Sequence, residues 1–227
     1  MGERKTYGSY NDGCAAAHAL DLIGDRWTMI IVRELLLGPK RFSDLQRDVM
    51  GIGPTILTRR LGDLVEAGVA VKGEVKGLPG EFYELTPWGY RLERVNNALA
   101  EWAVASTSLP WEADMSPDTL VLTMRAHARP RPDLVRSPAT VALHLTDSRQ
   151  AVAGEVTTYL ARLTPGETTI VREFTPGATT AALTATTRAL KAVILGQARY
   201  TLRTPGIITT GDPESVRCLL AATRLPS

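Results

Sequence analysis

The sequence predicts two domains, an N-terminal domain built mainly of helices with a small β-hairpin and a C-terminal domain of the α+β class. Two observations predict this division. Apolar residues in the first half recur at helical spacing, whereas in the second half they alternate along short runs before helical spacing returns. Between the halves, the stretch LPWEADMSPD fits neither pattern and is typical of a linker. We therefore place the first domain at residues 1–108, the linker at 109–118 and the second domain at 119–227.

The composition is that of an ordinary globular protein, with 227 residues of which 44% are apolar. No apolar run approaches the roughly 20 residues of a membrane-spanning helix, and the N-terminus lacks the apolar core of a secretory signal. We therefore expect a cytoplasmic protein that does not contact membranes. Residues 1–112 hold 13 Lys+Arg against 15 Asp+Glu, a net charge of −2, and the remainder carries +4. This balance disfavours non-specific coating of nucleic acid but allows a locally basic face.

The first two helices are predicted at residues 14–24 and from Trp27 to a stop at Gly38-Pro39. The second is apolar nearly all round except Arg33 and Glu34, which is typical of a helix at the centre of a core. One face of the first helix is formed by three apolar residues: Ala16, Leu20 and Ile23.

Residues 41–68 predict two short helices joined by a tight turn. In the first helix Phe42 and Leu45 face inward. Ser43, followed by Gln46 three residues later, fits a capping box at the start of that helix.

The glycines of Gly51-Ile52-Gly53 suit the sharp corner, and Pro54 suits the first turn of the second helix. That helix is expected to bury one stripe, formed by Leu57, Leu61 and Leu64. Four polar residues near its start then face solvent: Thr55, Thr58, Arg59 and Arg60.

A helix-turn-helix motif reads DNA with residues near the start of its second helix. We expect Thr55, Thr58 and Arg59 to enter the major groove. We expect Arg60 and Arg41 to meet the adjacent phosphates, and we count Ser43 and Pro54 among the DNA-binding residues. The alternative is a helical hairpin with a basic outer face and no DNA contact, and residues 41–68 alone do not decide between the two.

After Gly68 the apolar spacing changes from helical to alternating, which predicts a β-hairpin over residues 69–85. A hairpin directly after a recognition helix makes the wing of a winged helix, which commonly meets the DNA backbone or the minor groove. Lys72 and Lys76 are the natural phosphate contacts of such a wing. The alternative is a pair of solvated hairpin lysines.

Thr86-Pro87 predicts the start of a long helix that runs to about residue 106. Its apolar residues are spaced by 4, 3, 4 and 3, as in a coiled-coil seam: Trp88, Leu92, Val95, Leu99 and Trp102. We interpret this as a dimerisation helix that packs with the first helix of a partner chain, so that Ala16, Leu20 and Ile23 join the interface. The alternative is packing within the chain, against the C-terminal half.

The predicted order of elements is a helix, a buried helix, a helix-turn-helix, a wing and a long helix. With this order and its motifs, the stretch of residues 14–106 resembles the HxlR-type family of bacterial winged-helix regulators. The resemblance runs through Cys14, ALDLIGDRW, LLLGPKRFSDLQ, GIGPTILTRRLGDLVEAG and YELTPWG, in family order and with similar spacings. It implies a homodimer on a near-palindromic DNA operator, with the second helix of the motif in the major groove. One departure is Gly53, where the family often has Ser or Thr as the helix cap. Glycine caps almost as well but offers no side chain to a phosphate.

The second half predicts strands at residues 119–127, 140–146, 155–163, 168–174 and 179–184, with Pro165-Gly166 as a hairpin turn. A helix at residues 187–195 ends at Gly196, Ile207 and Ile208 form a short strand, and Asp212 caps a last helix.

Two stretches, ALTATTRALKAVILGQA at 182–198 and GIITTGDPESVRCLL at 206–220, resemble the sterol-carrier-protein type of lipid-binding domain. The resemblance implies an apolar cavity between sheet and helices that takes a small hydrophobic ligand. Its candidate lining residues are Met124, Leu143, Tyr159, Phe174, Leu190 and Ile194. The alternative is that these residues fill an ordinary core, because a cavity wall and a core face look alike in sequence.

No catalytic or metal-binding pattern is present: the three histidines form no HxH or HExxH, and GxSxG is absent. We therefore expect no enzyme activity, cofactor or metal. Cys14 begins the first helix, where the helix dipole lowers a thiol pKa, so redox sensing is one alternative mode of control. The other interpretation of Cys14 is an inert, small apolar residue.

The main hypothesis is a homodimeric transcription regulator whose C-terminal domain binds a small apolar effector. The alternative leaves DNA binding intact and makes the C-terminal half a lipid carrier or an oligomerisation module without a regulatory role.

Overall fold

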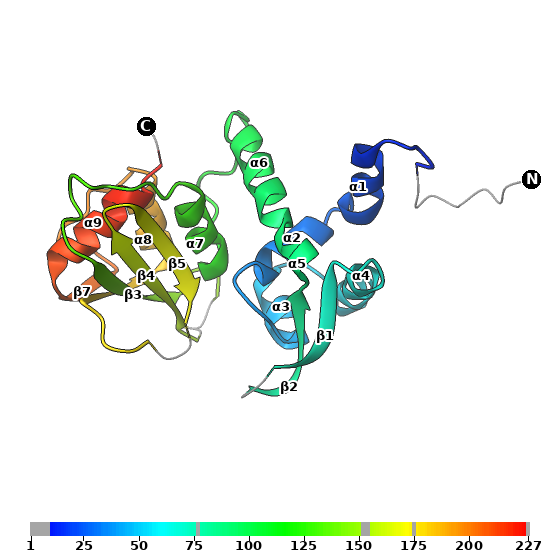
Figure 1. Ribbon diagram of the computed structural model, residues 1–227, viewed down its shortest axis with the longest axis horizontal. Helices are drawn as coiled ribbons and strands as arrows, with labels where there is room; N and C mark the ends of the chain where they lie inside the picture. Colours follow the sequence, from blue (N-terminus) through cyan, green and yellow to red (C-terminus); the bar gives the residue numbers. More distant parts are fainter. Residues whose placement is uncertain (1–9, 76–77, 151–154, 174–175, 226–227) are drawn as a thin grey trace, which may run out of the picture. The chain divides into compact units, whose positions relative to one another are not determined.

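The computed structural model describes residues 10–75, 78–150, 155–173 and 176–225. The chain divides into two compact units, Met1–Leu109 and Pro110–Ser227, which are treated separately below (Figure 1). The first is helical with a two-stranded hairpin, and the second is a mixed α+β domain with a five-stranded sheet. The predicted fold class is confirmed.

The N-terminal unit is arranged around one helix that is buried on most sides. Its elements are α1 (Ala15–Ile23), α2 (Thr28–Leu35), α3 (Phe42–Asp48), α4 (Pro54–Glu66), β1 (Ala70–Val75), β2 (Leu78–Leu85), α5 (Pro87–Tyr90) and α6 (Leu92–Val104). On α2, Ile31, Val32 and Leu35 are fully buried, as expected for the central helix of a core. β1 pairs antiparallel with β2, with Ala70 opposite Leu85.

The predicted capping box of Ser43 and Gln46 is wrong. Lys40 forms an isolated bridge with Tyr83 on β2, which keeps the chain extended up to Arg41. The helix therefore begins at Phe42, and Ser43 lies exposed in its first turn. The carboxylate of Asp44 accepts the backbone N–H of Arg41 at 3.3 Å and takes over the capping role.

The long helix predicted from Pro87 is present in two pieces, α5 and α6. Thr86 caps α5 by accepting the N–H of Gly89 at 3.0 Å. At the junction, the N–H of Arg91 bonds to the carbonyl of Trp88, and the N–H of Arg94 bonds to that of Arg91. These bonds span three residues instead of four, so the helix is tightened and interrupted at Arg91.

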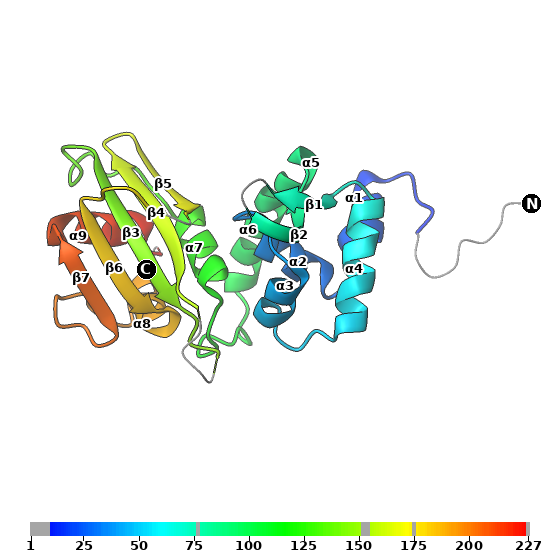
Figure 2. The same cartoon turned by 90° about the horizontal axis from the view of Figure 1, so that it is seen from below.

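The C-terminal unit is a sheet with helices on one face (Figure 2). Its elements are α7 (Pro117–Ala126), β3 (Ala139–Thr146), β4 (Thr157–Thr164), β5 (Glu167–Arg172), β6 (Ala181–Thr186), α8 (Thr187–Ile194), β7 (Ile207–Gly211) and α9 (Pro213–Thr223). The strand order is β5-β4-β3-β6-β7, and only the β3–β6 pair is parallel among these pairings. Alternate residues are buried along β6 and along the second half of β4, as one covered face requires.

The strand predicted at residues 119–127 is wrong, because that stretch is helix α7. Ser116 accepts the N–H of Thr119 at 3.0 Å, and Pro117 occupies the first helical position. Both are start signals of a helix. The other predicted elements of this half are confirmed as β3 to β7, α8 and α9, with Asp212 as the cap of α9. No helix in the described part of the chain is long and apolar enough to cross a membrane.

Candidate nucleic-acid interface

Helix α4 presents a polar face because its apolar residues are used in the core. Leu57 and Leu61 are fully buried and Leu64 is 1% exposed, so the predicted inward stripe is confirmed. Successive residues turn about 100° around a helix axis. Thr55 and Arg59, four residues apart, therefore share the opposite side, and both are exposed.

The outward side of α4 is open at its N-terminal half. Thr58 is exposed on the flank of that side, and Pro54 is exposed at the helix start. A Cβ added at Gly62, on the same side, would meet no heavy atom within 4 Å, so the space at Gly62 is open. Glu66, on the same side near the helix end, is exposed and acidic. The backbone N–H groups and the positive end of the helix dipole also lie at the start of α4, which suits a phosphate.

Arg60 lies on the other flank of α4 and is held by the protein. Its guanidinium pairs with Asp25 at 2.8 Å and with Asp63 at 2.8 Å, and its side chain is 21% exposed. These contacts connect α4 to the segment that precedes α2. Arg60 is thus separated from the open group formed by Thr55, Thr58 and Arg59.

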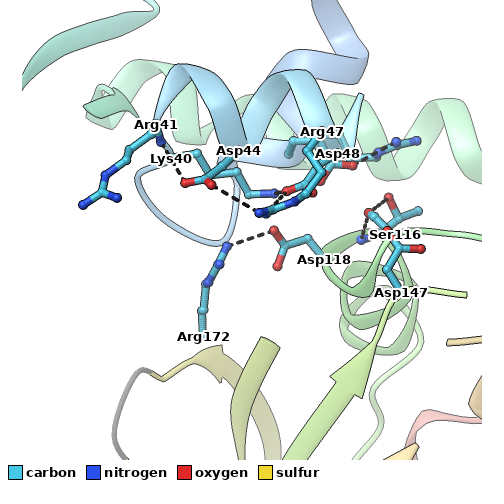
Figure 3. Close-up of polar contacts among 12 residues, drawn as sticks. Lys40, Arg41, Asp44, Arg47, Asp48, Ser116, Asp118, Asp147 and Arg172 are labelled. Carbon is cyan, nitrogen blue, oxygen red and sulfur yellow. Dashed lines mark hydrogen bonds and ion pairs between the residues drawn. The ribbon is translucent and has the colours of Figure 1, made fainter. Parts of the chain in front are cut away.

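Arg41 connects the start of α3 to the wing. Its guanidinium donates to the carbonyl oxygen of Pro79 at 2.6 Å and lies 5.1 Å from the centre of the Phe82 ring. Figure 3 shows its side chain directed away from the cluster around Asp48. Arg41 remains exposed, so it both fixes the wing and has N–H groups on the surface.

On the wing, Lys72 is paired across the hairpin with Glu81 at 2.8 Å. The hydrogen bond to that carboxylate raises the pKa of the Lys72 ammonium. A DNA phosphate would compete with the Glu81 carboxylate for the Lys72 ammonium. Lys76, the second predicted wing contact, lies outside the described residues.

The sequence reasoning missed a buried ion cluster beneath the motif. The ammonium of Lys40, 2% exposed, donates to Glu34 on α2 at 2.9 Å and to Asp48 at the end of α3 at 2.7 Å (Figure 3). The backbone of Lys40 also exchanges two hydrogen bonds with Tyr83 of the wing. Lys40 therefore joins α2, α3 and β2. The signal in the sequence was Glu34, a carboxylate in a helix that is apolar nearly all round, because a buried charge requires a partner.

The predicted dimer residues form an apolar surface on α1, α5 and α6. Neither α1 nor α6 contains a buried residue within this unit. An open pocket of about 860 Å³ lies between these helices, with Ile23, Trp88, Leu92 and Val95 among its lining residues. The exposed fractions of the larger apolar residues are 54% for Leu20, 49% for Trp88, 39% for Val95, 49% for Leu99 and 80% for Trp102. Ala16 is exposed and Ile23 and Leu92 are half-buried.

In the C-terminal unit, the predicted ligand residues lie in the core between sheet and helices. Met124, Leu143, Tyr159, Leu190 and Ile194 are at most 1% exposed, and Phe174 lies outside the described residues. A surface pocket of about 380 Å³ has other lining residues, among them Val193, Arg199 and Arg224.

One polar group reaches into this core. The hydroxyl of Tyr159 donates to Asp118 at 2.5 Å. The other oxygen of Asp118 accepts from Arg172 at 3.1 Å (Figure 3). Tyr159 is thus a satisfied polar residue among apolar neighbours.

Cys14 is exposed and occupies the N-cap position of α1. The backbone N–H groups of Ala17 and Ala16 lower the pKa of its thiol, which increases the thiolate fraction at neutral pH. Cys218 is buried in the other unit, and desolvation raises its thiol pKa.

Comparison with known proteins places residues 22–109 in a family model described as HxlR-like helix-turn-helix. The HTH-type transcriptional regulator YybR of Bacillus subtilis is 30% identical over 103 residues, which are 45% of this chain and 82% of YybR. The HTH-type regulator Rv3095 of Mycobacterium tuberculosis is 36% identical over 92 residues, 40% of this chain and 58% of that protein.

Among solved structures, the redox regulator HypR in its oxidized form is similar at 30% identity and a TM-score of 0.38. That match covers 42% of this chain and 100% of HypR. Each of these three matches covers less than half of this chain.

Proposed function

The chain belongs to the HxlR-like helix-turn-helix family of transcriptional regulators, and we propose that it is a homodimer which binds a near-palindromic operator and answers to a small apolar effector. The family is one of regulators, not of enzymes. A regulator that binds chromosomal DNA works in the cytoplasm, and we therefore infer a cytoplasmic location for this chain. The observation that carries the proposal is the outward side of α4, where Thr55, Thr58 and Arg59 are exposed over a fully buried leucine stripe.

Arg59 is the residue that reads a base in this proposal. It lies in the second turn of α4, it is exposed, and it forms no ion pair with a described residue. An arginine that bonds guanine in two places contributes about 1–3 kcal/mol of discrimination. Thr55 and Thr58 meet base edges beside it. Arg41 meets an adjacent phosphate, Lys72 and Lys76 contact DNA from the wing, and Ser43 and Pro54 complete the DNA-binding surface.

Operator binding by Arg59→Ala tests this assignment. The operator is selected from random duplex DNA with the full chain, and affinity is measured by fluorescence anisotropy at several salt concentrations. We expect a loss of about tenfold or more with relaxed preference at one base pair. Arg162→Ala, which removes an exposed arginine on β4, is the control. Unchanged affinity of Arg59→Ala at every salt concentration would refute the proposed recognition face.

Arg60 has a different expected role within the same proposal. Because Asp25 and Asp63 hold its guanidinium, a phosphate contact by Arg60 requires exchange of one of these partners. Arg60 therefore contributes to operator binding mainly by fixing α4 to the chain before α2.

Dimerisation through α1, α5 and α6 is supported by their exposed apolar residues. Contiguous exposed apolar surface on a soluble protein commonly marks an interaction site. On α6, Val95, Leu99 and Trp102 keep the spacing of a coiled-coil seam, and a second copy of the same surface is the natural partner. Native mass spectrometry of the purified chain tests this, since a monomer mass at micromolar concentration would contradict it.

The C-terminal domain is the proposed effector domain, of the sterol-carrier type. Support comes from the order of its strands and helices and from the apolar layer around Leu143, Leu190 and Ile194. An apolar ligand would open this layer between sheet and helices. A small molecule that co-purifies and alters operator affinity is the expected result. A ligand without any effect on DNA binding would favour the alternative of a lipid carrier attached to a regulator.

Cys14 supports a second candidate function, redox control. Its exposed position at the start of α1 and its lowered thiol pKa are the chemical requirements for oxidation by mild oxidants. Operator affinity is measured before and after treatment with hydrogen peroxide, with Cys14→Ser as the comparison. An equal response in wild type and Cys14→Ser would rule redox control through Cys14 out.

A further inference from the structure

A buried lysine fastens the segment before α7 to helix α8. Lys191 is the only lysine after residue 76 of the sequence, and it is 5% exposed. Its ammonium donates to the backbone carbonyl oxygens of Trp111 and of Ala113, the latter at 2.6 Å. A buried ammonium is costly unless hydrogen-bond acceptors compensate it. The carbonyl groups of Trp111 and Ala113 are therefore held against the ammonium of Lys191.

Arg188, one turn earlier on α8, holds the next residue of the same segment. Its guanidinium bonds to both carboxylate oxygens of Asp114, at distances from 2.5 to 3.2 Å. Arg188 is 72% exposed while Asp114 is 10% exposed. The two-point pair between Arg188 and Asp114 fixes the orientation of the segment relative to α8. The buried contacts of Lys191 contribute most of the free energy that holds the segment to the helix.

These contacts make residues 111–114 part of the C-terminal unit. The N–H of Ala113 closes a turn with Pro110, and Ser116 caps α7 two residues after Asp114. The predicted linker at 109–118 is thus fixed at its C-terminal end. Between the end of α6 and this fixed segment the chain has only residues 105–110.

Helix α8 is also the wall of the proposed effector layer. Leu190, next to Lys191 in sequence, is fully buried and Ile194 is 1% exposed. The helix packs against α7, α9 and β6. At its start, the N–H of Arg188 bonds to the hydroxyl of Ser148 at 3.0 Å. A ligand that enters beside Leu190 and Ile194 must move α8, because the layer is closely packed.

We propose that α8 and residues 111–114 move as one body through Lys191, so that α8 transmits effector binding to the chain leading to the DNA-binding domain. The proposal rests on the proposed function for its second half. Shifts of packed helices by 1–2 Å are a known means of such transmission. The first half, the common motion, requires neither DNA nor effector.

Amide hydrogen exchange of the full chain, followed by mass spectrometry, tests the common motion. Val193→Ala loosens α8 by removing buried methyl groups without touching the Lys191 contacts. We expect about tenfold faster exchange both in α8 and, within residues 111–114, at the Ala113 amide, which the hydrogen bond to Pro110 protects. When Val193→Ala is combined with Lys191→Met, its further effect should be confined to α8. Arg199→Met, which replaces another cationic side chain just beyond α8, is the control. In its background Val193→Ala should still speed exchange both in α8 and in residues 111–114.

Two results would overturn the common motion. Either Val193→Ala speeds exchange in α8 alone, or its effect on residues 111–114 survives in the Lys191→Met background. These exchange rates are measured without DNA, so they test the common motion whether or not the chain binds an operator. A failure of the proposed function would appear only in the DNA-binding measurements.

Transmission is tested by operator affinity in the same variants. Val193→Ala should change affinity at least about threefold, and the change should vanish in the Lys191→Met background. An unchanged affinity in Val193→Ala, or a change that persists with Lys191→Met, would refute the role of Lys191 in transmission.

Discussion

Replacing Lys40 with methionine should weaken the N-terminal domain more than any surface substitution. The change removes an ammonium that is 2% exposed and lies 2.9 Å from Glu34 and 2.7 Å from Asp48. Two buried carboxylates are then left facing a methyl group. Breaking a buried ion pair on one side costs about 3–5 kcal/mol.

The structure moderates that figure. Glu34 keeps a contact with Arg33 at 3.0 Å, and Asp48 keeps one with Arg47 at 2.8 Å. The remaining charges are therefore partly compensated, and we expect a loss of about 3 kcal/mol. Compared with total stabilities of about 5–15 kcal/mol, this loss is large.

The loss is best measured locally, because a chain of two domains does not unfold in a single transition. Exchange of the α2 and α3 amides against urea concentration reports the N-terminal domain alone. Lys72→Met, which removes a lysine whose pair with Glu81 is exposed, is the matched control and should change little. Adding Glu34→Gln to Lys40→Met should recover part of the loss. A loss below about 1 kcal/mol for Lys40→Met would refute the burial of this charge.

Three further results are expected. Leu99→Glu places a charge on the apolar surface of α6, where Leu99 is 49% exposed, and should shift native mass from dimer to monomer without loss of helix by circular dichroism. Gly211→Ala should destabilise the C-terminal domain by more than about 1 kcal/mol in urea. Gly211 has φ +74°, and its Cβ would lie 2.5 Å from the carbonyl oxygen of Thr180. Gly177→Ala, in the same domain, meets no heavy atom within 4 Å and serves as the control. The bond from Ser215 lowers the pKa of the Asp212 carboxyl below 3.8, so its stabilising effect is complete above that pH and is lost in more acidic solution. Asp212→Asn should show a shallower acid dependence of stability than wild type; identical curves would contradict this cause.

Most helices and strands followed from local signals. The leucine stripe of α4 was predicted because helical spacing and burial coincide there. Helix α7 was missed for a related reason: its Leu120, Val121 and Leu122 are all buried, and a continuous apolar run does not separate strand from helix. The start signal at Ser116-Pro117 would have decided the question.

What could not be predicted depends on distant partners. Arg60 and Arg59 are neighbours with the same side chain, yet Asp25 holds the first and leaves the second open. Lys191 resembled an ordinary helical lysine until the fold brought the carbonyl of Ala113 to it. The charges of residues and the spacing of apolar residues can be read from a sequence. Which ion partner a charged side chain has depends on the tertiary structure.

The burial of Lys40 and Lys191 has a practical consequence for chemical labelling. Of the lysines in the described residues, only Lys72 keeps an exposed amine, with 43% of its side chain accessible. Amine-reactive reagents should therefore modify Lys72 on the wing and leave Lys191, the one lysine of the Pro110–Ser227 unit, unlabelled. A fluorophore coupled at Lys72 would report on the wing directly, and a sample immobilised there would be tethered by the surface that is proposed to meet DNA.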